Sequence, residues 1–189
     1  MVRCSRQGRS GTAQGRRLTP SPPGDRGGHR LGGVGGQENT VLIRRAEPAD
    51  APEAIRVFRS SRTAAAAYLP SAAHTAAEDE EFVRGVLIAE RQTWLAVDGD
   101  GPAAGLLSLS PGWIDQLYVA PEYWGRGVGT LLLGHAKALQ PSGLQLWTFE
   151  SNLGARRFYE RHRFVAVERT DGAGNEERAP DVRYAWSGS

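Results

Sequence analysis

The sequence predicts an α/β (α+β) fold in which a mixed, mostly antiparallel central sheet carries helices on both faces. Three observations predict it. Apolar segments with strand or helix spacing follow one another from residue 41 to residue 186 in an irregular order. Two strand-like segments are joined at 98–102 by Gly and Asp, as in a hairpin. A further strand-like segment then runs into a glycine loop and a helix over 113–139, which predicts a crossover to a parallel strand.

The elements before the hairpin follow from spacing and capping signals. Val-Leu-Ile-Arg-Arg at 41–45 predicts an opening strand, and the acidic and proline residues after it predict the start of a helix over 49–60. A short helix is expected over 64–69, ended by the following proline. A longer helix is expected over 76–90, where apolar residues recur at helical spacing. The residues between these two helices, 71–75, are expected to form a loop.

The hairpin and the later elements complete the predicted order β-α-α-β-β-β-α-β-α-β-β. This order places an antiparallel meander before a βαβ crossover and excludes a regularly alternating doubly wound sheet. The expected strands are 93–97, 103–109, 113–119, 144–149, 164–169 and 182–186, the last helix is 152–161, and the closing strands are joined by a loop over 172–180.

The composition predicts one domain with an N-terminal tail. A chain of 189 residues has room for one well-buried core. Residues 1–40 are rich in Gly, Arg, Ser and Pro, so we expect a disordered tail followed by a folded domain over 41–189. The first 37 residues hold seven arginines and one acidic residue, and because the whole chain has a net charge of +2, the remainder is net acidic. The tail has the charge to contact nucleic acid, but a solvated leader or a start codon placed too far upstream is the simpler interpretation.

Targeting and redox signals are sparse. The tail lacks the apolar centre of a secretory signal, and no stretch approaches the roughly 18 apolar residues of a membrane span. Cys4 is the single cysteine, so disulfides and cysteine-rich metal sites within the chain are excluded. His74, His135 and His162 do not have metal-ligand spacing, and His135 is expected on the outer face of its helix. We therefore expect a cytoplasmic protein without a metal or a membrane partner.

The glycine loop predicts an anion site. Glycines at 125, 127 and 129 allow backbone conformations closed to other residues and let the chain lie directly against a ligand. The helix begins inside this loop, so its free N–H groups and its dipole favour a phosphate or pyrophosphate. A purely structural strand-to-helix turn is the alternative. The loop has no lysine before Thr130, which excludes a Walker loop, and the spacing of its glycines does not fit a dinucleotide fingerprint.

Two motifs, together with the order of elements, show which family the chain resembles. The first is Leu117-Tyr-Val-Ala-Pro-Glu-Tyr-Trp-Gly-Arg-Gly-Val-Gly-Thr-Leu-Leu-Leu133, and the second is Asn152-Leu-Gly-Ala-Arg-Arg-Phe-Tyr-Glu-Arg-His-Arg-Phe164. Over about residues 41–186 the chain resembles the GNAT superfamily of N-acetyltransferases. Two residues depart from the family pattern, because Trp124 stands where Gln or Arg is usual and Arg163 where Gly is usual. If the helix ends in a left-handed residue at 163, arginine there is strained by roughly 1 kcal/mol or more.

The resemblance implies how acetyl-CoA would be held. In the family the loop binds the pyrophosphate through backbone N–H groups, so the implied cradle is Gly127, Val128, Gly129 and Thr130, with Trp124, Gly125 and Arg126 beside it. Arg126 either adds charge to the pyrophosphate or is a solvated loop cation. Leu117 and Val119 are implied to pair with the pantetheine amides as an added strand would. That pairing requires strands 113–119 and 144–149 to splay apart.

The second motif carries two further candidates. Asn152 is well placed to cap the helix that follows it, and by resemblance it also contacts the pantetheine arm; the two roles are weighed equally. Tyr159 is implied to act as the general acid toward the departing thiolate, since a phenol with a pKa near 10 is a suitable donor. The alternative is a half-buried tyrosine whose hydroxyl simply finds a partner.

The attacking amine must be neutral, so the site needs a base or a route to water. Asp115, on the strand before the loop, and Glu150, at the end of the next strand, are candidates by position, and each is equally well explained as a structural or solvated carboxylate. The function predicted by the resemblance is acetyl transfer from acetyl-CoA to an amine of an unidentified small molecule or peptide. A non-catalytic acyl-CoA-binding module or sensor is the alternative. The resemblance leaves the oligomeric state open between a monomer and a homodimer, although the closing strands in this family often meet those of a partner. The net acidic body argues against a nucleic-acid partner.

Overall fold

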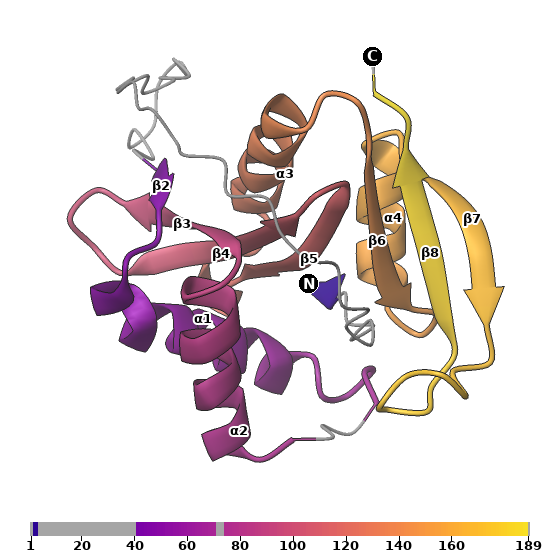
Figure 1. Cartoon of the computed structure of the whole chain (residues 1–189), viewed down its shortest axis with the longest axis horizontal. Helices are drawn as coiled ribbons and strands as arrows, with labels where there is room; N and C mark the ends of the chain where they lie inside the picture. The colour runs from indigo at the N-terminus through magenta and orange to yellow at the C-terminus, as the bar shows by residue number, and fades with distance from the viewer. Residues whose placement is uncertain (1, 4–40, 71–73, 189) are drawn as a thin grey trace, which may run out of the picture.

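An eight-stranded sheet organises the chain in the computed structural model, which describes residues 2–3, 41–70 and 74–188. Its strands run in the order β2-β3-β4-β5-β6-β8-β7, and β1 pairs with β5 off this path (Figure 1). The strands are β1 Val2–Arg3, β2 Val41–Arg45, β3 Gln92–Asp98, β4 Ala103–Ser110, β5 Trp113–Val119, β6 Leu144–Phe149, β7 Val165–Thr170 and β8 Asp181–Trp186. Among the strands of the described residues, only β5 and β6 pair in parallel, which confirms the predicted mixed, mostly antiparallel sheet.

Helices cover both faces of the sheet, as predicted. On one face, Phe58 of α1 packs edge-on against Tyr118 of β5 with ring centroids 5.0 Å apart. On the other face α3 lies so close to β4 that a Cβ at Gly105 would meet the Leu132 side chain at 2.8 Å. The helices are α1 Ala51–Ala64, α2 Ala76–Glu81 with its π-helical continuation η2 Phe82–Ile88, α3 Val128–Leu139 and α4 Leu153–Arg161, with short 3-10 turns at η1 Pro48–Asp50 and η3 Pro121–Tyr123.

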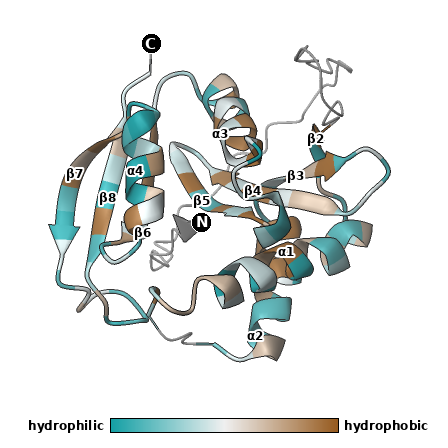
Figure 2. Ribbon diagram, turned by 180° about the vertical axis from the view of Figure 1, so that it is seen from behind, coloured by the Kyte–Doolittle hydropathy of each residue, from teal (hydrophilic) through white to brown (hydrophobic). Residues whose placement is uncertain are grey.

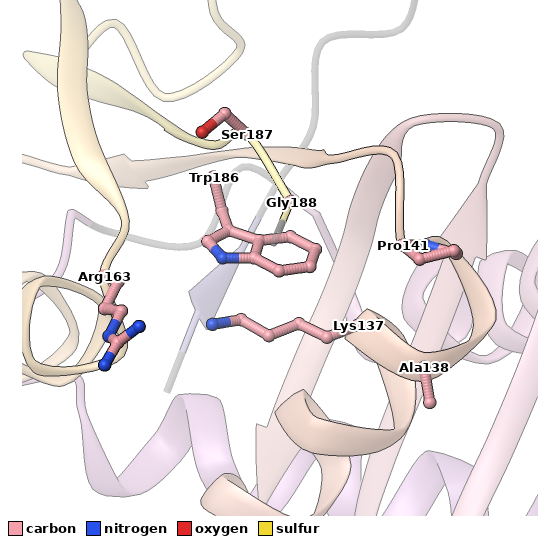
Figure 3. Close-up of a pocket in the computed structure, with 7 residues that line it drawn as sticks. All are labelled: Lys137, Ala138, Pro141, Arg163, Trp186, Ser187 and Gly188. Atoms are coloured by element: carbon pink, nitrogen blue, oxygen red, sulfur yellow. The ribbon is translucent and has the colours of Figure 1, made fainter.

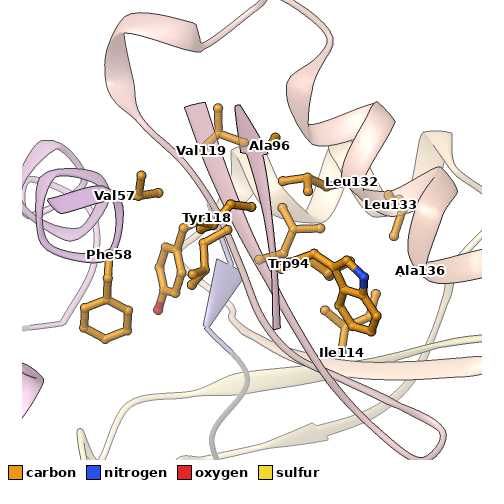
Figure 4. Packing of buried hydrophobic residues seen from close by; sticks show 14 of the residues in the cluster. Val57, Phe58, Trp94, Ala96, Ile114, Tyr118, Val119, Leu132, Leu133 and Ala136 are labelled. Atoms are coloured by element: carbon orange, nitrogen blue, oxygen red, sulfur yellow. The ribbon is translucent and has the colours of Figure 1, made fainter. Parts of the chain in front are cut away.

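The core forms where these layers meet. Figure 4 shows Val57 and Phe58 of α1 on one side of the strands and Leu132, Leu133 and Ala136 of α3 on the other. All five side chains are at most 1% exposed. The hydropathy colouring in Figure 2 agrees with this position of the core. The central strands are mostly apolar, whereas α2 and the C-terminal end of β7 are hydrophilic. Burial of this apolar surface is the main term that holds the sheet between its helices.

Two predicted helices differ from the structure. The short helix expected over 64–69 is wrong, because α1 runs on to Ala64 and the chain then turns, with the N–H groups of Tyr68 and Leu69 both bonded to the Ala65 carbonyl. The helix expected over 76–90 exists, but from Phe82 it continues as a π-helix. Thr75 caps it, accepting a hydrogen bond from the Glu78 N–H. Of the loop predicted over 71–75, residues 71–73 lie outside the described residues.

The β5–β6 junction is the feature that shapes the candidate site. These strands share one pair, Trp113 with Gln145, and then separate. β1 lies along β5 in the space that opens, with Val2 opposite Leu117 (Figure 1). The splayed strands implied by the family resemblance are therefore present. Of the predicted tail, residues 4–40 lie outside the described residues, and Val2–Arg3 form a strand that the sequence did not predict.

Candidate functional site

The glycine loop turns the chain from β5 into α3. Gly125 and Gly127 have φ values of +75° and +83°, in the left-handed region that favours glycine, and a Cβ at either position would project into open space. Gly127 is the residue before the first helical residue of α3, so the helix starts with no side-chain cap. The first N–H groups of α3 have no intrahelical acceptor and carry the positive end of its dipole. This end of the helix is suited to bind an anion.

Gly129 has a different role from the other two glycines. Its backbone is helical, and a Cβ there would lie 3.4 Å from the Phe158 ring of α4 and 3.7 Å from Val119. The small residue lets α3 pack close to α4 and to the end of β5. Arg126 is exposed, and its guanidinium lies 5.5 Å from the centre of the Tyr123 ring. That contact holds a positive charge beside the loop.

Trp124, which stands where the family has a polar residue, contacts the strand. Its indole Nε1 donates to the Val119 carbonyl at 2.8 Å, and the side chain stays 43% exposed. The same carbonyl accepts a second hydrogen bond from Ser61 Oγ of α1 at 2.6 Å. Ser61 is not among the site residues predicted from the sequence. No local signal identifies it, because the contact joins residues 58 positions apart.

The open edge of β5 consists of backbone groups of Leu117 and Val119. The Ala120 N–H donates to the Ala104 carbonyl at 2.9 Å, and the register places Gly105 opposite Val119. In such a ladder the N–H and carbonyl of Val119 point away from β4, and those of Leu117, two residues earlier, do the same. The pairing of Val2 with Leu117 shows that extended backbone fits this edge.

Asn152 and Tyr159 are both buried at α4. The Asn152 side chain is 3% exposed and accepts a hydrogen bond from the Ala155 N–H at 3.1 Å, which confirms its predicted capping role. Tyr159 is fully buried, more deeply than the half-buried alternative assumed. Its ring packs against Phe158 and Phe164 with centroids 5.2 and 5.4 Å away. This packing fixes the direction of the phenol.

The two candidate bases lie in different environments. Asp115 Oδ1 accepts a hydrogen bond from Ser110 at 2.9 Å, and the buried Oδ2 lies 4.0 Å from Arg91 Nε. Burial raises the pKa of Asp115, against the opposing effects of Ser110 and Arg91. Glu150 is instead largely exposed and forms an ion pair with Arg169. Of the two carboxylates, Asp115 is thus the more buried, with 22% of its side chain exposed against 45% for Glu150.

A pocket of about 610 Å³ lies at the other end of α3 (Figure 3). The Lys137 ammonium in it donates to the His162 carbonyl at 2.6 Å and lies 4.6 Å from the centre of the Trp186 ring. Burial and the nearby Arg163 lower the pKa of Lys137. Ten residues of helix separate Gly127 from Lys137, about 15 Å at 1.5 Å per residue. The pocket is therefore distinct from the glycine loop, and its lysine joins the end of α4 to α3 and β8.

Two of the histidines, His135 and His74, contact other elements of the fold. His135 is not on an outer face; its ring packs on Trp94 with centroids 5.3 Å apart, and burial lowers its pKa. His74 contacts Glu176 at 2.8 Å, which links the segment before α2 to the β7–β8 loop. Within the described residues, no three His, Cys, Asp or Glu side chains are grouped so that they could hold a metal ion. None of the helices in the described ranges is long and apolar enough to cross a bilayer.

Comparison with known proteins gives consistent matches. Residues 46–164 match the acetyltransferase (GNAT) family. The uncharacterized N-acetyltransferase YafP of Escherichia coli (strain K12) is 32% identical over 150 residues, 78% of this chain and 91% of that protein. The peptidyl-lysine N-acetyltransferase YjaB of Salmonella typhimurium is 32% identical over 131 residues, 69% of this chain and 88% of that protein. The solution structure of apo-form YjaB from Escherichia coli superposes with a TM-score of 0.64 at 29% identity, covering 79% of this chain and 99% of that one.

Proposed function

Because the chain belongs to the acetyltransferase (GNAT) family, we propose that it transfers an acetyl group from acetyl-CoA to a primary amine by direct attack, without a covalent enzyme intermediate. The observation that carries this proposal is the uncapped start of α3 at Gly127 beside the open edge of β5. Helix N–H groups suit a pyrophosphate, and an open strand edge suits the amides of an extended arm. Acetyl-CoA has both chemical features.

Each residue has a defined role in this proposal. Acetyl-CoA supplies an acetyl group already activated as a thioester. The N–H groups of Val128 and Gly129 hold the pyrophosphate, and the backbone of Leu117 holds and orients the amide arm. Tyr159 gives its phenol proton to the leaving sulfur. Asp115, in its ionised form, removes the proton of the attacking amine, directly or through water.

The acceptor amine follows from the relatives only as a proposal. The two YjaB proteins are peptidyl-lysine N-acetyltransferases by name. A lysine ε-amine in a peptide is therefore the first acceptor to test. A lysine is protonated at neutral pH, so its use as a nucleophile depends on a base, and the raised pKa of Asp115 brings that carboxyl closer to the working pH.

A pair of substitutions at Gly127 tests the cosubstrate site. Asp and Asn have almost the same shape, and both tolerate the left-handed conformation better than other residues that carry a Cβ. Any backbone strain at φ +83° is therefore the same in Gly127→Asp and Gly127→Asn. Only Asp adds a negative charge. We expect Gly127→Asp to bind acetyl-CoA and CoA at least about tenfold more weakly than Gly127→Asn in calorimetry, because like charges repel at short range. Equal affinities for the two variants would remove the pyrophosphate from this loop, and no binding by the wild-type protein would remove the cosubstrate altogether.

The same protein preparation separates an enzyme from a sensor. An acyl-CoA sensor would bind the cosubstrate but acetylate none of a panel of lysine peptides and small amines. If turnover is found, Tyr159→Phe removes the phenol proton while keeping the ring in its aromatic surroundings. We expect kcat to fall by about 10²-fold or more, with little change in the affinity for acetyl-CoA. An unchanged kcat would assign the acid role to another group.

A further inference from the structure

The carbonyl oxygen of Val119 accepts hydrogen bonds from two side chains that are far apart in the sequence. Ser61 Oγ donates from α1 at 2.6 Å, and Trp124 Nε1 donates from the loop after β5 at 2.8 Å. A carbonyl oxygen has two lone pairs, so these two donors saturate it. Ser61 is fully buried, and its hydroxyl leaves its own helix to make this bond. Its neighbour Ser60 instead bonds within the helix, to the Val57 carbonyl at 3.3 Å.

This carbonyl lies on the edge where an added strand pairs. The register of β4 and β5 turns the backbone groups of Val119 away from β4, toward the space in which β1 pairs with Leu117. An extended ligand on this edge meets Leu117, whose backbone groups point toward it and lie opposite Val2 of β1 in this structure. At Val119 the carbonyl is already bonded within the chain. The family resemblance alone did not predict this difference between the two residues.

We infer that Ser61 and Trp124 are positioning residues for acetyl-CoA, which anchor the end of β5 and the start of the glycine loop to α1 through the Val119 carbonyl. The inference rests on the proposed function. Trp124 directly precedes Gly125, whose φ of +75° lies in the left-handed region that favours glycine. Holding Ser61 and Trp124 on the Val119 carbonyl limits the conformations of the end of β5, so less entropy is lost when the pantetheine arm pairs with this edge.

A second contact of α1 supports this role. Arg56 donates to the Glu122 carboxylate at 3.0 Å and to the Ala103 carbonyl, so it joins α1 to the turn before the loop and to β4. α1 thus holds both the strand end and the turn that follows it. Arg56 forms an exposed ion pair of modest strength, whereas the Ser61 bond is fully buried. The buried bond is the one expected to set the geometry.

Ser61→Ala, with Ser60→Ala as the matched control, tests the inference. Two ligands are compared by calorimetry: acetyl-CoA, and 3′-phospho-ADP, which carries the pyrophosphate but no pantetheine arm. We expect Ser61→Ala to weaken acetyl-CoA binding by about 2- to 10-fold, the range for one lost hydrogen bond, and to leave the 3′-phospho-ADP affinity within twofold. Ser60→Ala is expected to match the wild type with both ligands. Trp124→Phe, which keeps a ring but loses the N–H, should act in the same direction as Ser61→Ala.

The outcomes separate this inference from the proposed function. If the wild type binds neither ligand, the proposed function fails. If the wild type binds acetyl-CoA and Ser61→Ala binds it equally well or more tightly, the positioning role is overturned, because the freed carbonyl then makes no difference or is itself a better contact. An equal loss for both ligands would also overturn it, since that result shows a general loosening of the fold. A lower Tm without a selective change in affinity would make the Ser61 bond structural only.

Discussion

Asp115 lies at an irregularity in the pairing of β4 with β5, and this position determines its surroundings. The pairs Ser108 with Gln116 and Leu109 with Ile114 leave Asp115 as the extra residue of a β-bulge. Bulges re-aim a side chain and occur often beside active sites. The bulged carboxylate receives the Ser110 hydrogen bond, while burial disfavours its charged form.

The raised pKa of Asp115 makes opposite predictions for activity and stability. If the ionised form is the base, kcat/KM falls as pH falls through this pKa, at a higher pH than for an ordinary Asp. Asp115→Asn should remove that limb of the pH profile and lower kcat by about 10²-fold or more. For stability, the folded state binds the proton more tightly than the unfolded state, so stability decreases as pH rises from the unfolded pKa through the folded one.

Asp115→Asn should abolish this stability change as well, since Asn does not titrate. Thermal melts and rate profiles from pH 4 to pH 8, recorded on both proteins, check the two predictions together. A flattened stability curve with an unchanged rate profile would leave Asp115 a structural carboxylate.

Two residues after helix α4, the chain passes through an arginine in a backbone conformation that favours glycine. Arg163 has φ of +65°, and the Phe164 N–H reaches back to the Tyr159 carbonyl at 3.0 Å, which is the bonding pattern of a left-handed helix end. The strain anticipated from the sequence is therefore present. Arg163 also adds positive charge near Lys137 and so lowers the pKa of that lysine.

Arg163→Gly is expected to stabilise the protein. It relieves the left-handed strain and the repulsion with Lys137, for a gain of about 1 kcal/mol, or a rise in Tm of about 2–4 °C. Arg157→Gly is the matched control, because Arg157 is exposed in the interior of the same helix, where glycine costs about 1 kcal/mol. Scanning calorimetry of the two variants should show shifts of opposite sign. A lower Tm for Arg163→Gly would mean that contacts of the arginine outweigh its strain.

At the scale of the whole molecule, the open edge of β5 pairs with residues from the N-terminus, which are far from β5 in the sequence. Val2 and Arg3 pair with Leu117 and Gln116 in the space between β5 and β6. The proposed pantetheine arm needs the same edge at Leu117. The N-terminal strand and acetyl-CoA would therefore compete.

Removal of residues 1–40 should tighten acetyl-CoA binding. The apparent Kd is the intrinsic Kd divided by the fraction of molecules whose edge is free, so a strand docked half of the time weakens binding about twofold. Calorimetry of the full chain and of residues 41–189 measures this factor. The full chain carrying both Val2→Pro and Arg3→Pro is the control, because proline cannot donate to a strand edge. Equal affinities in all three proteins would mean that the strand does not compete.

Much of the fold could be predicted from the sequence because its signals are local. The strand periods, the cap at Asn152 and the glycines at 125 and 127 each act within a few residues, and the structure confirms all of them. The helix expected over 64–69 was wrong because Ala64 is the last residue of α1 and the residues after it form a turn closed on the Ala65 carbonyl. The strand β1 was missed because two residues carry no periodic signal.

The sequence by itself determined the order of elements, the glycine loop and the residues that carry the family resemblance, since each depends on near neighbours along the chain. Only the tertiary structure decided which of the candidate site residues have surroundings that suit the roles proposed for them. It placed Asp115 in a buried bulge and Glu150 in an exposed ion pair, and it joined Ser61 to Val119 across 58 positions. The physical reason is that burial and long-range hydrogen bonds depend on how strands and helices pack, and sequence spacing does not encode that packing.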